Sequence, residues 1–138
     1  MPAAAAHTAA MVLLDTHMLL WAALQPERLP AAAMKLLRSR ETAVAYSLAS
    51  LWEVAIKTSL GRPDFNVDAA VLRRWLAAEG ITELPIKAEH ILQVAHLAWH
   101  HRDPFDRLLV AQAQVESIKL WSVDSALRPY GHAVRVLG

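Results

Sequence analysis

Short apolar runs alternate with helical patterns along this chain, and this alternation constrains the fold more than any other feature. Five runs are expected to form strands: MVLLD (11–15), TAVAYS (42–47), ITELPI (81–86), KLWSVD (119–124) and HAVRVL (132–137). The third run is the weakest candidate, because Pro85 has no N–H to donate to a neighbouring strand. Strands that are apolar throughout are typical of parallel sheets with both faces covered.

Helical patterns fill the stretches between these runs. They cover residues 17–24, 31–40, 48–60, 68–79, 88–101 and 104–117. Glycine or proline follows several of them, as at Gly61 and Gly80, where a helix is expected to stop. Strands alternating with helices predict an α/β fold with a mostly parallel sheet covered by helices on both faces.

The length and composition limit the classes of protein to consider. A chain of 138 residues with 55% hydrophobic residues fits one domain, expected at 11–138, and residues 1–10 (MPAAAAHTAA) are expected to be a disordered, dispensable extension. Either Met1 or Met11 could be the true start. No membrane span is expected, and the absence of cysteine rules out thiolate sites and is compatible with a cytoplasmic location. A net charge of +1 predicts no general nucleic-acid-binding surface.

Carboxylates stand at the points where the predicted elements meet. Asp15 and Asp124 end apolar strands, Glu53 lies early in the helix after the second strand, and Asp106 lies in the first turn of 104–117. In an open parallel sheet ligands bind at the carboxyl ends of the strands, so all four could face one site. Their mutual repulsion would be relieved by Mg²⁺ or Mn²⁺, which prefer oxygen ligands and pair with phosphate.

Helix capping is the alternative for each carboxylate taken alone. Ser50 and Glu53 fit an S-x-x-E capping box, and Asp103 with Pro104 and Asp106 fits a helix start. Asp15 and Asp124 could likewise cap the segments that follow them. Four such residues at one sheet end favour a metal site over four independent caps, because no cap would compensate for their repulsion.

Four stretches resemble one known family: LLDTHMLLW, SLASLWEVAIKTSLGR, HHRDPFDRLLVAQA and LWSVDSALRPYG. In this order and spacing they resemble PIN-domain ribonucleases of the VapC toxin type, and the resemblance covers residues 11–138. It implies a three-layer sandwich with strand order 3-2-1-4-5, self-association, and inhibition by a small VapB-like antitoxin. It also implies that Asp15, Glu53, Asp106 and Asp124 are the catalytic, metal-binding quartet.

Residues around the quartet have two interpretations each. Thr16 and Ser50 match hydroxyls near the family's metal site but could cap helices, and Asp103 is expected to be an N-cap more than a metal neighbour. Possible RNA contacts are Lys57, Arg62, His101 and Arg107. The alternatives are an i,i+4 pair of Lys57 with Glu53, a solvated loop charge at Arg62, and an exposed histidine pair at a helix end for His101. Arg107 is expected to point to the rim of the site.

The other histidines and the tryptophans are not expected to take part in catalysis. His96 and His100 stand four residues apart, but no third zinc ligand accompanies them. Trp21 and Trp52 are expected to pack in the core or between subunits rather than on RNA bases. Trp75 lies in a helical pattern that could form a groove with 48–60, and an antitoxin helix is expected there.

The sequence therefore predicts a metal-dependent endoribonuclease toxin in which metal-activated water cleaves an RNA phosphodiester bond. The alternative is a catalytically silent PIN-fold module that binds protein partners, and the intact quartet argues against it. A phospho-accepting domain is disfavoured because no lysine follows a late strand. A D-x-D phosphatase is excluded because Thr16 and His17 follow Asp15.

Overall fold

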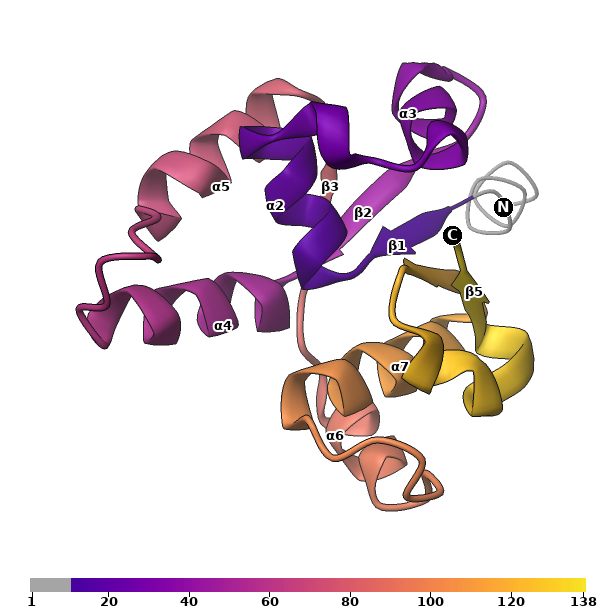
Figure 1. Ribbon diagram of the computed structural model, residues 1–138. Coiled ribbons are helices and arrows are strands. Elements are labelled where there is room, and N and C mark those ends of the chain that lie inside the picture. Colours follow the sequence, from indigo (N-terminus) through magenta and orange to yellow (C-terminus); the bar gives the residue numbers. More distant parts are fainter. Residues whose placement is uncertain (1–10) are drawn as a thin grey trace.

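A five-stranded parallel sheet forms the centre of the computed structural model, which describes residues 11–138 (Figure 1). The strands are β1 (Val12–Leu14), β2 (Val44–Ser47), β3 (Thr82–Leu84), β4 (Lys119–Ser122) and β5 (Val134–Val136). Their order is β3-β2-β1-β4-β5 and every pairing is parallel, so the predicted fold class and strand order are confirmed. The disordered extension expected at 1–10 lies outside the described residues.

Helical segments follow the strands much as the patterns predict. They are α2 (Thr16–Leu24), η1 (Pro26–Arg28), α3 (Ala31–Arg38), α4 (Leu48–Ser59), α5 (Ala69–Ala78), α6 (Ala88–Val94), α7 (Pro104–Glu116) and η2 (Ser125–Ala133). The helix predicted at 88–101 is too long: α6 ends at Val94, and the Arg107 side chain bonds the carbonyls of Val94 and Ala98. Within residues 11–138 no helix is long and apolar enough to cross a bilayer.

The helices cover both faces of the sheet, which gives the predicted three layers (Figure 1). On one face α2, α3 and α5 pack over side chains such as Leu14, Tyr46 and Trp121. On the other face α7 and η2 pack over Leu13 and Leu120. Successive strand residues face opposite layers, so the apolar runs of the sequence supply two separate cores.

β3 lies at the edge of the sheet, where its short length and the following proline are tolerated. It ends at Leu84, one residue before Pro85, and so covers the middle of the predicted 81–86 run. The Tyr46 hydroxyl donates to Glu83 Oε1 at 2.5 Å, and Arg73 donates to both Glu83 oxygens at 2.7 and 3.0 Å. These contacts tie the edge strand to β2 and α5.

The tryptophans differ in their exposure and neighbours. Trp52 is 55% exposed, so it is not a core residue and packing between subunits stays a prediction; its ring meets Phe105 edge-on at 5.0 Å. Trp75 lines a pocket of about 920 Å³ whose walls come from α2, α3 and nearby segments and include no residue of α4. Trp21 is partly buried against the core, as predicted.

Leucine-to-alanine substitutions should lower the free energy of unfolding more at a buried position than at an exposed one. Leu120 is fully buried, so we expect Leu120→Ala to lower the free energy of unfolding by about 2–5 kcal/mol. Leu24 is 57% exposed, so Leu24→Ala is the matched control and should change it by about 0.5 kcal/mol or less. Urea unfolding of both variants measures the difference, and equal effects would contradict the assignment of the core.

Candidate functional site

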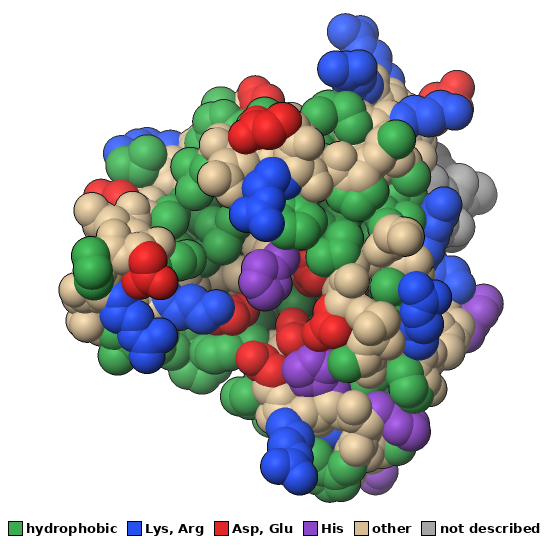
Figure 2. Space-filling view, in the orientation of Figure 1, with side chains coloured by type: hydrophobic (Ala, Val, Ile, Leu, Met, Phe, Trp, Pro, Cys, Tyr) green, Lys and Arg blue, Asp and Glu red, His purple; other side chains and the backbone are tan. Residues whose placement is uncertain are grey.

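Acidic side chains gather in a hollow at the carboxyl edge of the sheet. Figure 2 shows the carboxylates in the middle of this face, with histidine side chains on either side of them. They come from four separate segments: the end of β1, α4, the first turn of α7 and the loop after β4. The parallel sheet brings these segments together because every strand points the same way.

Asp15 is buried at the end of β1 and is held by two hydrogen bonds. Its Oδ1 accepts from the Met18 backbone N–H at 2.9 Å, so it caps α2 as the alternative interpretation required. Its Oδ2 accepts from the Ser122 hydroxyl at 2.5 Å. Burial raises the pKa of Asp15, although these two hydrogen bonds act in the opposite direction.

Ser122 is a site residue that the sequence analysis missed. Its hydroxyl donates to Asp15 and accepts from the Asp124 N–H at 3.0 Å, so it links two of the carboxylates. Leu14 pairs with Trp121, and this register places Ser122 beside Asp15. A lone hydroxyl at the end of the apolar run KLWSVD was the available signal.

Glu53 takes no part in a capping box. The N-cap of α4 is Ser47, whose hydroxyl accepts from the Ala49 N–H at 2.9 Å, so the capping box predicted for Ser50 and Glu53 is wrong. Glu53 is buried, its Oε2 lies 3.0 Å from Lys57 Nζ, and its Oε1 is buried without a hydrogen-bond partner in the described part of the chain. A buried, unpaired carboxylate oxygen is costly unless something binds it.

Thr16 and Ser50 join two helices beside the carboxylates. The Thr16 hydroxyl donates to Ser50 Oγ at 2.8 Å, and both side chains are buried. Neither hydroxyl caps its helix, because Asp15 caps α2 and Ser47 caps α4. Their role is to fix the start of α2 against α4, and thus Asp15 relative to Glu53.

Asp103 and Asp106 of the DPFD segment have different environments: Asp103 caps a helix, and Asp106 lies near the other acids. Asp103 is the N-cap of α7, accepting from the N–H groups of Phe105 at 2.8 Å and Asp106 at 3.1 Å, as expected. The pKa of Asp106 is raised to about 7, mainly by burial and also by the charges of Asp103, Asp15 and Glu53, while His101 acts to lower it. The Asp106 carboxyl therefore lies within the field of the other acids.

His101 lies among the carboxylates rather than at a helix end. Its Nε2 is 3.0 Å from Asp124 Oδ2 and 3.3 Å from Asp106 Oδ2, and these three groups lie within 4.8 Å of one another. Asp124 also caps η2 by accepting from the Ala126 N–H. Burial acts to raise the pKa of Asp124, but the hydrogen bonds from Ala126 and His101 outweigh it and the pKa is lowered.

Arg107 does not point to the rim, so its predicted RNA contact is wrong. The residue is only 4% exposed, and its guanidinium donates to the carbonyl of Val94 at the end of α6, to that of Ala98 beyond it, and to the Tyr130 hydroxyl. Lys57 is half-exposed and pairs with Glu53, as one of its two interpretations predicted. Arg62 is exposed in the turn after α4.

The zinc interpretation of His96 and His100 finds no support in the described residues. The one cluster of three potential ligands found within 11–138 contains neither residue. Both side chains are exposed, and the His100 ring meets Tyr130 edge-on at 5.1 Å. α6 ends before either residue, so their predicted spacing along one helix does not exist.

The donor set fits a hard divalent cation. The side chains are carboxylates, which Mg²⁺ and Mn²⁺ prefer, and Glu53 Oε1 has no partner among residues 11–138. Burial, and to a smaller extent the neighbouring acids, raises the pKa values of Asp15 and Asp106, and a bound cation would favour their ionised forms. These residues could hold such an ion.

A parallel α/β sheet with carboxylates at its carboxyl edge defines a class of protein that binds ligands at this edge. Residues 12–132 match the sequence profile of the PIN domain, and the chain belongs to the PIN domain family. A search of curated proteins found no significant match.

Solved structures show the same fold. A chain of the VapBC2 complex from Rickettsia felis, crystallised with a promoter DNA fragment, has a TM-score of 0.69 at 13% identity, covering 91% of this chain and 98% of its own length. The VapBC-5 structure from Mycobacterium tuberculosis, a member of the VapBC family of toxin–antitoxin systems, has a TM-score of 0.59 at 18% identity. It covers 93% of this chain and 98% of its own. The fold is thus shared with chains of two toxin–antitoxin complexes.

The raised pKa of Asp106 predicts how metal-free stability depends on pH. Because the pKa of Asp106 is higher in the folded protein, its protonation adds to the free energy of unfolding. This contribution is complete below the ordinary pKa of 3.8 and is lost as the pH rises through about 7. In EDTA, we expect the melting temperature of wild type to fall more between about pH 5 and about pH 8 than that of Asp106→Asn. At the higher pH the variant should be at least as stable as wild type.

The matched control is Asp64→Asn, which changes an exposed aspartate in the turn after α4. Its melting curve should follow that of wild type at every pH. If Asp106→Asn is destabilised at high pH instead, Asp106 is a helix-start residue whose carboxylate stabilises α7, and the crowding of acids around it is not costly.

Proposed function

We propose that this protein is a Mg²⁺- or Mn²⁺-dependent endoribonuclease toxin that a cognate antitoxin inhibits. The observation that carries the proposal is the proximity of Asp15, Glu53, Asp106 and Asp124, whose charges act on one another or which share contacts with His101. Asp106 is close enough to Asp15 and Glu53 for their charges to raise its pKa. Membership of the PIN domain family and the fold shared with VapBC chains support the same function.

The four carboxylates would hold the ion, with Ser122 and Met18 keeping Asp15 in place. A bound Mg²⁺ or Mn²⁺ supplies a Lewis acid that activates water and stabilises charge on the phosphodiester. The hydrogen bonds on Asp15 and Asp124 fix the direction of their carboxyl groups before any ligand arrives. Such fixed charges need no rearrangement during the reaction.

Exposed cations on α4 and in the turn after it are the proposed contacts for the RNA backbone. Lys57 lies one helical turn beyond Glu53 with its side chain 43% exposed, and Arg62 is exposed in the following turn. Lysine and arginine at such positions bind phosphate without reading bases. Arg107 is excluded from this role by its burial, and His101 points at carboxylates.

An apolar stripe along α4, which ends at the C-cap residue Leu60, is the proposed surface for the antitoxin. Trp52, Ile56 and Leu60 follow one another at i,i+4 spacing and are 55%, 36% and 58% exposed. Such a stripe suits an amphipathic helix from a partner. It begins next to Glu53, so a partner bound there would also cover the edge of the acidic hollow. The groove expected between the Trp75 helix and residues 48–60 stays a separate prediction, since α4 and α5 contact each other.

Cleavage of RNA tests the proposed activity. Wild type should cut single-stranded or loop-containing RNA in Mg²⁺ or Mn²⁺ and stop when EDTA is added, because the carboxylates alone supply no Lewis acid. Asp106→Asn and Glu53→Gln should lower the rate by about a hundredfold or more. Asp64→Asn, prepared identically, should cleave like wild type.

Two outcomes would contradict the proposal. Cleavage that resists EDTA and survives both substitutions would come from a contaminant or another mechanism. Failure of wild type to cleave any RNA, with the antitoxin-type partner still bound, would favour the catalytically silent interaction module.

Self-association is a separate prediction. Exposed apolar side chains also occur on the α6 side of the molecule, at Ile91, Leu92 and Trp99, which are 58%, 68% and 77% exposed. Apolar surface beyond the α4 stripe favours a homodimer. Sedimentation at a concentration on the order of tens of micromolar should give a dimer mass. A monomer under these conditions would contradict the prediction.

A further inference from the structure

We propose that His101 is a positioning residue of the acidic site, which holds Asp106 and Asp124 through its Nε2–H and does not itself bind the metal. The inference rests on the proposed function, because it assumes that these carboxylates hold an ion. It concerns a residue whose two ring nitrogens both have short contacts, to a backbone N–H on one side and to carboxylates on the other.

The backbone contact decides which nitrogen carries the proton. His101 Nδ1 accepts a hydrogen bond from the Asp103 N–H at 3.0 Å. A backbone amide can only donate, so Nδ1 must present its lone pair there. In the neutral ring the proton is then on Nε2, which is a donor and has no lone pair for a metal.

The carboxylate contacts agree with this tautomer. Nε2 lies 3.0 Å from Asp124 Oδ2 and 3.3 Å from Asp106 Oδ2, and both oxygens are acceptors. A single N–H can thus attract two carboxylates that would otherwise repel each other. His101 lies close enough to these acids to be a metal ligand with them. The direction of its hydrogen bonds makes Nε2 a donor to the carboxylates instead.

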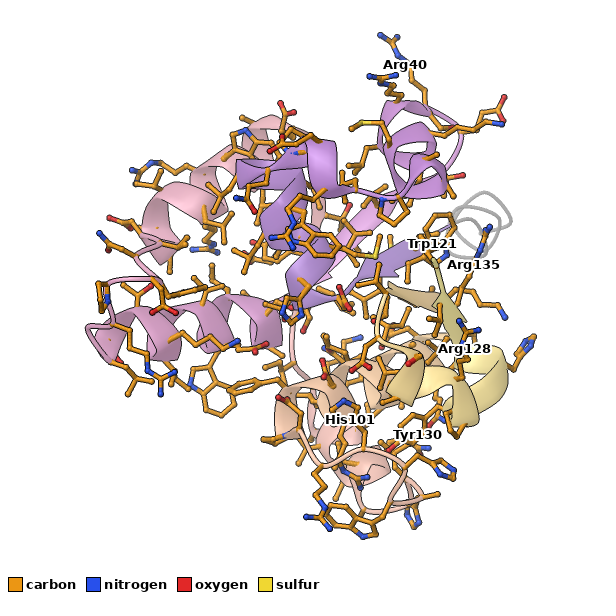
Figure 3. The ribbon with its side chains drawn as sticks, in the orientation of Figure 1. Arg40, His101, Trp121, Arg128, Tyr130 and Arg135 are labelled. Carbon is orange, nitrogen blue, oxygen red and sulfur yellow. The ribbon has the colours of Figure 1, made fainter. Side chains whose placement is uncertain are left out.

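The segment that carries His101 is fixed by Arg107. This buried guanidinium donates to the carbonyls of Val94 at 3.2 Å and Ala98 at 3.0 Å, lies 3.5 Å from the His101 carbonyl, and stacks at 4.0 Å on Trp99. Tyr130 donates to the same Ala98 carbonyl, and Figure 3 shows His101 and Tyr130 on neighbouring segments.

Both partners of the contact between His101 and Asp106 therefore depend on α7. Its first turn supplies the Asp106 carboxylate to the hollow and, one residue later, the Arg107 guanidinium to the preceding loop. No ion pair joins Arg107 to a carboxylate within residues 11–138, so its donors serve the loop. This arrangement fixes the ring of His101 relative to the acids.

The test compares Mn²⁺ binding by wild type and three variants, followed by electron paramagnetic resonance of the bound ion. His101→Gln keeps an N–H donor near the position of Nε2, and its Mn²⁺ affinity should stay within about threefold of wild type. His101→Ala removes the donor and should weaken binding about tenfold or more, as loss of an outer-shell partner does. His100→Gln, the matched control, should bind like wild type.

Pulsed resonance of Mn²⁺ in wild type separates a positioning residue from a ligand. We expect no coupling of the size that a directly bound imidazole nitrogen gives. A direct nitrogen coupling that disappears in His101→Gln would overturn the proposal, and so would an unchanged affinity in His101→Ala. Melting in EDTA shows that each variant is folded.

Asp106→Asn distinguishes failure of this inference from failure of the proposed function. If Mn²⁺ binds wild type and Asp106→Asn abolishes binding, the metal site stands and the His101 variants alone decide the role of the histidine. If wild type binds no Mn²⁺, the proposed function and the role of His101 are both wrong.

Discussion

Burial of several carboxylates close together at one edge of the sheet is the constraint on which the rest of the site depends. Burial raises the pKa values of Asp15 and Asp106, so each acid is costly to ionise where it stands. The surrounding structure offsets part of this cost with donors, from Ser122 to Asp15 and from Ala126 and His101 to Asp124. One Glu53 oxygen is left without any donor among residues 11–138. A bound cation would stabilise the ionised carboxylates further than these hydrogen bonds do.

Capping and metal binding are compatible roles rather than alternatives. Asp15 and Asp124 each cap a helical segment with one oxygen and present the other toward the neighbouring polar groups. A cap fixes the carboxyl group at a helix start, and the helix starts after β1 and β4 lie at the same edge of the parallel sheet. The elements that stabilise the fold therefore also orient the acids. Asp103 caps α7 in the same way and leaves Asp106 in the hollow.

Local patterns predicted the strands, most helices and the acidic residues, because those features depend on neighbours in the sequence. The strand order was implied by the family resemblance and is confirmed. The environments of Arg107, His101 and Trp52 were not predictable, since each depends on a segment distant in the chain. Arg107 is buried where its guanidinium donates to the carbonyls of Val94 and Ala98, and the stretch HHRDPFDR does not contain these partners. Trp52 is largely exposed, and its ring contacts Phe105 of α7, a residue distant in the sequence.

The most direct test of the central claim is anomalous diffraction from crystals of the protein soaked in Mn²⁺. The account predicts a manganese peak in the acidic hollow, coordinated by oxygens of Asp15, Asp106 or Asp124, with no bond from His101 Nε2. Glu53 should take part through its unpaired oxygen, directly or through water. An empty hollow at saturating Mn²⁺, or a peak bound only elsewhere on the molecule, would contradict the account.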